Sequence, residues 1–115
     1  MKHEKTKIVD KILRVIHSQA TSMFSGNLKS VILYGSYARG DYQNDSDIDV
    51  MVLVDMDKHD LMCYEKKIAH LSSKIDLDYD VFTSIKLQDY KTYNDWLNVV
   101  PFYQNVQREG VFVNG

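Results

Sequence analysis

The sequence predicts a small α/β sandwich in which helices flank a sheet of three or more strands. Stretches with helical spacing of apolar residues alternate with short apolar runs along the chain. One of these runs is so continuously apolar that both of its faces must be covered, which places it at the centre of the sheet. The chain has 115 residues, of which 44% are apolar, enough for one core, so we expect a single domain spanning residues 1–115.

Periodicity and polarity predict the elements of the first half of the chain. Apolar residues recur at steps of three and four over residues 5–24, which predicts an amphipathic helix that ends near a Ser-Gly-Asn turn. Residues 30–34 form a short buried strand, and residues 35–46 are a polar loop. Residues 48–54 read Ile-Asp-Val-Met-Val-Leu-Val, which is the continuous apolar run expected at the centre of the sheet.

The middle of the chain is predicted to form a second helix and a third strand. Apolar residues keep helical spacing over residues 61–71, and Asp57 is a suitable cap for the first turn of this helix. Residues 77–84 alternate between two faces, which predicts a strand. In that strand Asp78 and Asp80 leave the same face of the sheet.

Two helices and a short tail are predicted for the C-terminal part. Residues 87–93 have a brief helical spacing. Pro101 can open a helix over residues 102–109, because the first turn leaves its N–H groups unpaired and proline has none, and Gly110 can close it. Residues 111–113 are long enough only for an edge strand or a packed tail.

Charge and cysteine content exclude several classes of protein. With 14 basic and 16 acidic residues the net charge is −2, so the chain lacks the positive field that gathers nucleic acid, and we expect no nucleic-acid partner. A single cysteine permits no intrachain disulfide and favours a reducing compartment. The sequence has no signal-peptide pattern and no apolar run of about 20 residues, so we expect a cytoplasmic protein without a membrane partner.

The polar segment between the first two predicted strands carries the chemistry. Residues 35–50 read Gly-Ser-Tyr-Ala-Arg-Gly-Asp-Tyr-Gln-Asn-Asp-Ser-Asp-Ile-Asp-Val. Gly35 lets the backbone approach a ligand closely. Ser36 offers a hydroxyl and an N–H at the start of a helical turn, a position that favours phosphate oxygens. Tyr37 and Tyr42 are the aromatic residues to test for contact with a nucleotide.

Two carboxylates open the central strand. Asp47 and Asp49 are two residues apart, so both side chains leave the same face. Carboxylates this close raise each other's pKa unless they share a divalent cation, and Mg²⁺ prefers such oxygen ligands together with phosphate oxygens. A phosphate-binding turn beside this pair is a layout for phosphoryl or nucleotidyl transfer, in which two metal ions about 4 Å apart stabilise the attacking and leaving oxygens.

A third carboxylate from a neighbouring strand would complete such a metal site. The candidates are Asp76, Asp78 and Asp80, and of these Asp78 and Asp80 share a face of the predicted strand. We favour Asp80, because the apolar pair that follows it places it deeper in the strand, and we keep Asp78 as the alternative.

The motif resembles the signature of the DNA polymerase beta-like nucleotidyltransferase superfamily, in which a Gly-Ser pair, ten residues and Asp-x-Asp follow one another. The segment as a whole resembles the minimal (MNT-type) nucleotidyltransferases. The resemblance implies a small nucleotidyltransferase fold with a mixed sheet, and Mg²⁺-dependent transfer of AMP from ATP to a hydroxyl. It implies that Gly35 and Ser36 hold phosphates and Arg39 steadies the triphosphate. Asp47, Asp49 and the third aspartate, Asp80, would then bind two Mg²⁺ ions and act in catalysis.

The resemblance also suggests a partner. Small MNT-type proteins are often paired with HEPN-domain proteins in toxin–antitoxin modules, where the small protein adenylylates and silences a HEPN ribonuclease. For this chain the resemblance therefore implies an antitoxin that is a protein adenylyltransferase. The alternative is a non-catalytic antitoxin that neutralises a HEPN partner by forming a complex, and modification of a free small molecule is a third reading.

Simpler interpretations of the same residues stay open. The two aspartates can serve only to solvate the start of a strand, Asp80 can cap a helix or pair with a lysine, and Arg39 can form a surface ion pair. A calcium-binding loop starting at Asp45 is excluded, because Val50 stands where such a loop needs a glycine and Met56 where it needs a bidentate glutamate.

Overall fold

The computed structural model describes residues 2–113 and the side chains of residues 4–113. Six helices, one 3₁₀ turn and four strands follow one another in this part of the chain. In order they are α1 (Lys2–Phe24), η1 (Ser25–Asn27), β1 (Leu28–Tyr34), α2 (Ser36–Arg39), β2 (Ile48–Val54), α3 (Lys58–Met62), α4 (Glu65–Tyr79), β3 (Thr83–Asp89), α5 (Tyr90–Trp96), α6 (Pro101–Glu109) and β4 (Val111–Val113). The predicted fold class, a mixed sheet of at least three strands flanked by helices, is confirmed.

The sheet has the strand order β3-β2-β1-β4. Strand β1 runs antiparallel to β2 and to β4, whereas β2 and β3 are parallel. Every residue of β2 is buried except Asp49, which is half-buried. The prediction that residues 48–54 form the central strand is therefore confirmed, and it places one carboxylate near the start of an inner strand of the sheet.

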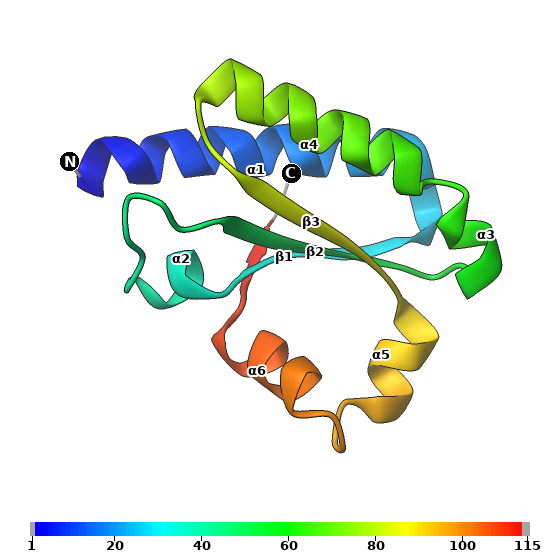
Figure 1. The fold of residues 1–115 in the computed structure, drawn as a ribbon. Coiled ribbons are helices and arrows are strands. Elements are labelled where there is room, and N and C mark those ends of the chain that lie inside the picture. The colour runs from blue at the N-terminus through cyan, green and yellow to red at the C-terminus, as the bar shows by residue number, and fades with distance from the viewer. Residues whose placement is uncertain (1, 114–115) are drawn as a thin grey trace.

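Helices cover both faces of the sheet (Figure 1). Helices α1 and α4 cover one face of the sheet. There Val50, Val52 and Val54 of β2 belong to the same hydrophobic core as the buried residues of these two helices. Helices α5 and α6 cover part of the other face, where Met51 and Leu53 pack with Tyr93 and Val106. Because side chains alternate along a strand, Asp49 lies on the α5 and α6 side.

The predicted strand over residues 77–84 is wrong. Helix α4 continues to Tyr79, Asp80 adopts a left-handed conformation with φ 54° as its C-cap, and β3 begins only at Thr83. The apolar stripe of the helix extends through Ile75 at helical spacing, and this longer pattern overrides the local alternation. Leu77 lies on this helix and is 85% exposed.

Other element boundaries were partly predicted. The helix expected over residues 61–71 is divided into α3 and α4, while Asp57 caps α3 by accepting a hydrogen bond from the His59 N–H at 3.1 Å. Residues 87–89 continue β3 instead of starting a helix. Pro101 opens α6 and Gly110 caps its end, as predicted. No helix of the described part of the chain is both long and apolar enough to span a membrane.

Candidate functional site

A glycine turn joins β1 to the short helix α2. Gly35 has φ 74° and ψ −155°, a conformation that is essentially restricted to glycine, and its carbonyl oxygen accepts hydrogen bonds from the N–H groups of Ala38 and Arg39, each at 3.1 Å. A Cβ atom at this position would collide with the Oδ2 atom of Asp49. The absence of a side chain at Gly35 therefore brings the turn against the half-buried carboxylate.

This contact predicts a large effect of Gly35→Ala on stability. Both the backbone conformation and the collision with Asp49 oppose a Cβ atom, so we expect the free energy of unfolding to fall by at least about 2 kcal/mol. Gly26→Ala is the matched control, because its Cβ position is open, with no atom within 4 Å apart from its own local chain segment. Urea denaturation measures both, and a loss at Gly35 no greater than at Gly26 would contradict this interpretation.

The predicted phosphate-binding residues lie at this turn. Ser36 is half-buried at the first position of α2, and its hydroxyl makes no hydrogen bond to any described residue, so it is available to a ligand. Tyr37 and Tyr42 stack on each other with ring centroids 4.2 Å apart and an interplanar angle of 12°. Their stacked faces are therefore occupied by each other.

Asp47 and Asp49 stand at the start of β2 with different environments. Asp47 is the residue immediately before the strand, and its side chain is exposed. Asp49 is the second residue of the strand, and its side chain is half-buried. Burial raises the pKa of Asp49, the negative charge of Asp47 raises it further, and the charge of Arg39 lowers it. The two carboxylates therefore repel each other, and a cation bound to both would relieve the repulsion.

Arg39 forms surface ion pairs. Its Nε atom lies 3.2 Å from Asp41 Oδ2, and its Nη1 atom lies 3.5 Å from Glu109 Oε2. The side chain is 44% exposed. The structure thus shows the ion-pair alternative directly, and contact between Arg39 and a triphosphate would require exchange of these partners.

The predicted third carboxylate is not brought to the pair. Asp80 is an exposed helix cap, because the strand on which it was expected is the end of α4. Asp78 is exposed on α4, and Asp76 accepts hydrogen bonds at 2.8 Å from both the N–H and the hydroxyl of Thr83. Within residues 4–113 no three His, Cys, Asp or Glu side chains lie close enough together to hold a metal ion. Asp47 and Asp49 supply two oxygen ligands suited to Mg²⁺, and substrate oxygens would have to complete the shell.

Strand β3 adds two residues that were missed from the sequence. In its parallel register with β2, Ser84 pairs with Asp49 and Lys86 pairs with Met51, so both point to the face of Asp49. Lys86 is exposed and forms no ion pair with a described residue. Correct placement of the strand over residues 83–89 would have identified them by alternation alone.

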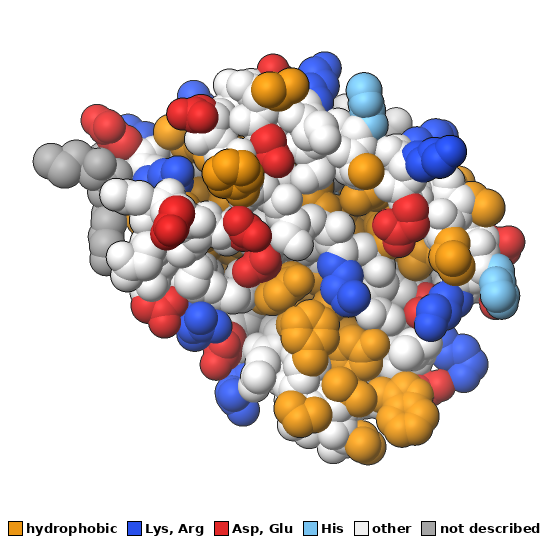
Figure 2. Space-filling view, viewed as in Figure 1, with side chains coloured by type: hydrophobic (Ala, Val, Ile, Leu, Met, Phe, Trp, Pro, Cys, Tyr) orange, Lys and Arg blue, Asp and Glu red, His pale blue; other side chains and the backbone are white. Residues whose placement is uncertain are grey.

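An aromatic surface adjoins Asp49 on the other side. Tyr34 pairs with Asp49 across β1 and β2, and burial followed by the charge of Asp49 raises the pKa of Tyr34. The ring of Tyr34 meets that of Phe102 edge-on, with centroids 5.6 Å apart. Figure 2 shows hydrophobic side chains gathered over α5 and α6. Three hydrophobic side chains on and between α5 and α6 are exposed: Phe102 to 38%, Trp96 to 52% and Val99 to 64%. We call these three residues, two of which are aromatic, the aromatic patch.

Comparison with known proteins shows which family the chain belongs to. A family model described as a nucleotidyltransferase domain matches residues 13–103. The chain belongs to the nucleotidyltransferase family. A protein of Methanocaldococcus jannaschii, provisionally named protein adenylyltransferase MJ0604, is 32% identical over 101 residues, which are 88% of this chain and 93% of that protein. The prediction that the chain is a nucleotidyltransferase is thereby confirmed.

Solved structures share the fold of this nucleotidyltransferase. One is a provisionally assigned minimal nucleotidyltransferase, with a TM-score of 0.56 and 18% identity, covering 94% of this chain and 92% of the other. Another is a toxin–antitoxin crystal structure with AMP-PNP, with a TM-score of 0.50 and 21% identity, covering 84% of this chain and 68% of the other. At these identities the similarity shows a common fold.

Proposed function

We propose that the nucleotidyltransferase transfers AMP from ATP to a hydroxyl group of a partner protein, with Mg²⁺ bound at Asp47 and Asp49. The packing of Asp49 against the Gly35 turn carries this proposal. It joins a backbone turn suited to phosphate with a carboxylate pair suited to a divalent cation. We further propose that the partner is a HEPN-type protein and that the two form a toxin–antitoxin pair. The toxin–antitoxin structure that shares this fold supports the second step.

In the proposed reaction the acceptor oxygen attacks the α-phosphorus of ATP. A new oxygen–phosphorus bond forms, and the bond to the leaving pyrophosphate breaks. We assign the acceptor's proton to Asp49, the more buried of the two carboxylates. Gly35 and Ser36 hold the phosphates, and Lys86 adds positive charge on the same face of the sheet. Bound Mg²⁺ supplies charge neutralisation on the phosphate oxygens.

The aromatic patch favours a protein as the acceptor. Phe102 of this patch contacts Tyr34, which pairs with Asp49, so an acceptor bound to the patch would lie on the same face of the sheet as Asp49. Exposed tryptophan and phenylalanine side chains are typical of protein interfaces. The 32% identity with a protein provisionally named as a protein adenylyltransferase supports the same acceptor class.

Co-expression with a candidate HEPN-type partner, followed by intact-mass spectrometry of that partner, tests the proposal. We expect the partner to gain the mass of one or more AMP groups. In vitro, label from [α-³²P]ATP should transfer to the partner with Mg²⁺ present, label from [γ-³²P]ATP should not, and EDTA should abolish transfer. Transfer of the γ-label, or transfer that persists in EDTA, would contradict the proposal.

One observation favours a second candidate function. Since no third carboxylate of residues 4–113 joins Asp47 and Asp49, the chain is also suited to be a non-catalytic antitoxin that neutralises its partner by forming a complex. A stable complex in which the partner is silenced without any gain in mass would establish that function in place of AMP transfer.

A further inference from the structure

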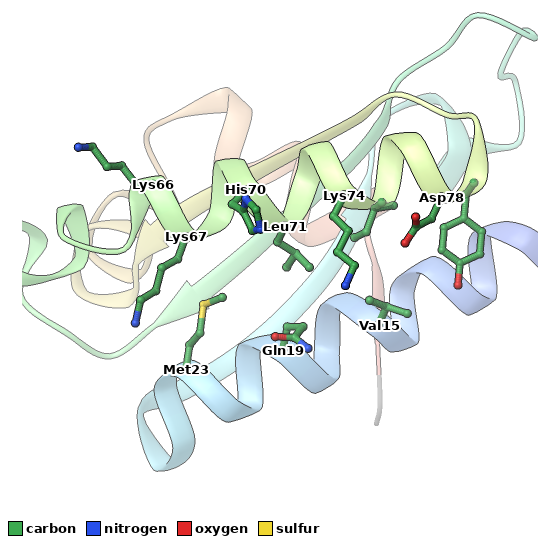
Figure 3. Close-up of a pocket in the computed structure, with 11 residues that line it drawn as sticks. Val15, Gln19, Met23, Lys66, Lys67, His70, Leu71, Lys74 and Asp78 are labelled. Atoms are coloured by element: carbon green, nitrogen blue, oxygen red, sulfur yellow. The ribbon is translucent and has the colours of Figure 1, made fainter.

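A groove of about 650 Å³ runs between α1 and α4 (Figure 3). These helices cover the face of the sheet opposite Asp49. From α1 the groove is lined by Val15, Gln19 and Met23, and from α4 by the buried side chains of Leu71 and Ile75. The groove is therefore separate from the carboxylate pair.

The groove is elongated along the two helices. Val15, Gln19 and Met23 are four residues apart and so occupy one face of α1. The lining residues of α4 extend from Lys66 to Tyr79. At a rise of 1.5 Å per residue this stripe is about 20 Å long. Such a length matches a helix of about 13 residues better than a compact small molecule.

The walls of the groove are basic, although the chain as a whole has a net charge of −2. Four lining side chains of α4 are basic and one is acidic, namely Lys66, Lys67, His70 and Lys74 against Asp78. None of the four forms an ion pair with a carboxylate in the described part of the chain. Lys67 instead places its Nζ atom 5.4 Å from the centroid of the Tyr64 ring.

We propose that this groove binds an acidic amphipathic helix of a partner protein. Apolar side chains of that helix, at spacings of three and four, would lie on Val15, Met23 and Leu71. Its flanking carboxylates would meet Lys67 and Lys74, which Figure 3 shows extending from α4 toward α1. Cations that have no carboxylate partner among the described residues, beside an apolar floor, select for opposite charge in the occupant and against basic helices.

Binding to a synthetic peptide tests this proposal without any catalytic step. The probe is a fluorescein-labelled peptide of about 14 residues with leucines at helical spacing and glutamates on both flanks. A matched peptide carries lysines in place of the glutamates. Fluorescence anisotropy should show that the acidic peptide binds and that the basic peptide does not. Chemical-shift changes in a ¹⁵N-labelled chain should fall on α1 and α4 and not on β2.

Charge reversal distinguishes the groove from general electrostatic attraction. Lys67→Glu with Lys74→Glu should weaken binding of the acidic peptide at least about tenfold. Lys7→Glu with Lys11→Glu changes the net charge equally at exposed positions of α1 that do not line the groove, and it should weaken binding less than about threefold. All four lysines are at least partly exposed, and circular dichroism should show unchanged thermal unfolding for both variants.

Several results would overturn the proposal. Either failure of the acidic peptide to bind to the chain or equal weakening of its binding by the two double variants would contradict the proposal. Binding of dodecanoate without binding of the peptide would instead identify a site for a small anionic amphiphile. If the chain self-associated and the double variant Lys67→Glu with Lys74→Glu did not, the groove would be a contact between copies of the chain. None of these results depends on AMP transfer, so this proposal and the proposed reaction can fail separately.

Discussion

Asp49→Asn is expected to reduce AMP transfer to the partner by at least about 100-fold. The amide keeps the shape of the carboxylate but cannot bind Mg²⁺ as an anion or accept the proton of the acceptor. Initial rates with saturating ATP measure the effect. Asp55→Asn is the matched control, because Asp55 is an exposed aspartate immediately after the other end of β2. Comparable loss in both variants would show that the carboxylate of Asp49 has no special role.

The same substitution is expected to leave the fold as stable as before, or more stable, at pH 7. Burial and the charge of Asp47 raise the pKa of Asp49, so the folded chain binds this proton more tightly than the unfolded chain does. The proton on Asp49 therefore stabilises the fold fully at pH values below the pKa of Asp49 in the unfolded chain. This stabilisation is lost as the pH rises through the higher pKa of Asp49 in the folded chain. At pH 7 asparagine removes this unfavourable charge. If Asp49→Asn unfolded at a clearly lower urea concentration than the wild type, that result would contradict this argument.

Titration of the same carboxyl tests the metal site. In Mg²⁺-free protein the midpoint for Asp49, followed by ¹³C NMR, should lie above the ordinary value of 3.8. Mg²⁺ should lower this midpoint, because the cation competes with the proton for the carboxylate. A midpoint that Mg²⁺ does not change would exclude Asp49 as a ligand.

The sequence predicts the core of this fold well where one strong pattern is present. Residues 48–54 are buried from both sides, so their composition identifies β2 with its observed bounds. The Gly-Ser turn follows β1, Asp47 precedes β2 and Asp49 is its second residue, so the local sequence is sufficient to place them. These features define half of the candidate site.

The other half depends on contacts that are distant in sequence. The alternation over residues 77–84 competes with the helical stripe of α4, and only packing on the sheet decides between them. That error misplaced Asp80 and concealed Lys86, whose position depends on the parallel register of β3 with β2. The pairing of Arg39 with Glu109, 70 residues away, likewise has no local signal.

Trp96→Ala is expected to raise the KM for the partner protein at least about tenfold while leaving the KM for ATP unchanged. Trp96 is 52% exposed, so its removal takes away contact area for the partner and creates no buried cavity. Tryptophan is enriched among residues that dominate binding energy at interfaces, and a tenfold change corresponds to about 1.4 kcal/mol. Steady-state rates of partner labelling at several partner concentrations measure the change.

Leu77→Ala is the control for this effect. Leu77 is 85% exposed on α4, on the side of the sheet away from Asp49, so it tests loss of an exposed apolar side chain outside the aromatic patch. Its KM for the partner should match wild type. If Trp96→Ala lowered kcat without changing the KM, the patch would act on the carboxylate site through Tyr34 and not as a docking surface. If both variants matched wild type, the acceptor would have to approach Asp49 from the side of β3 and Lys86.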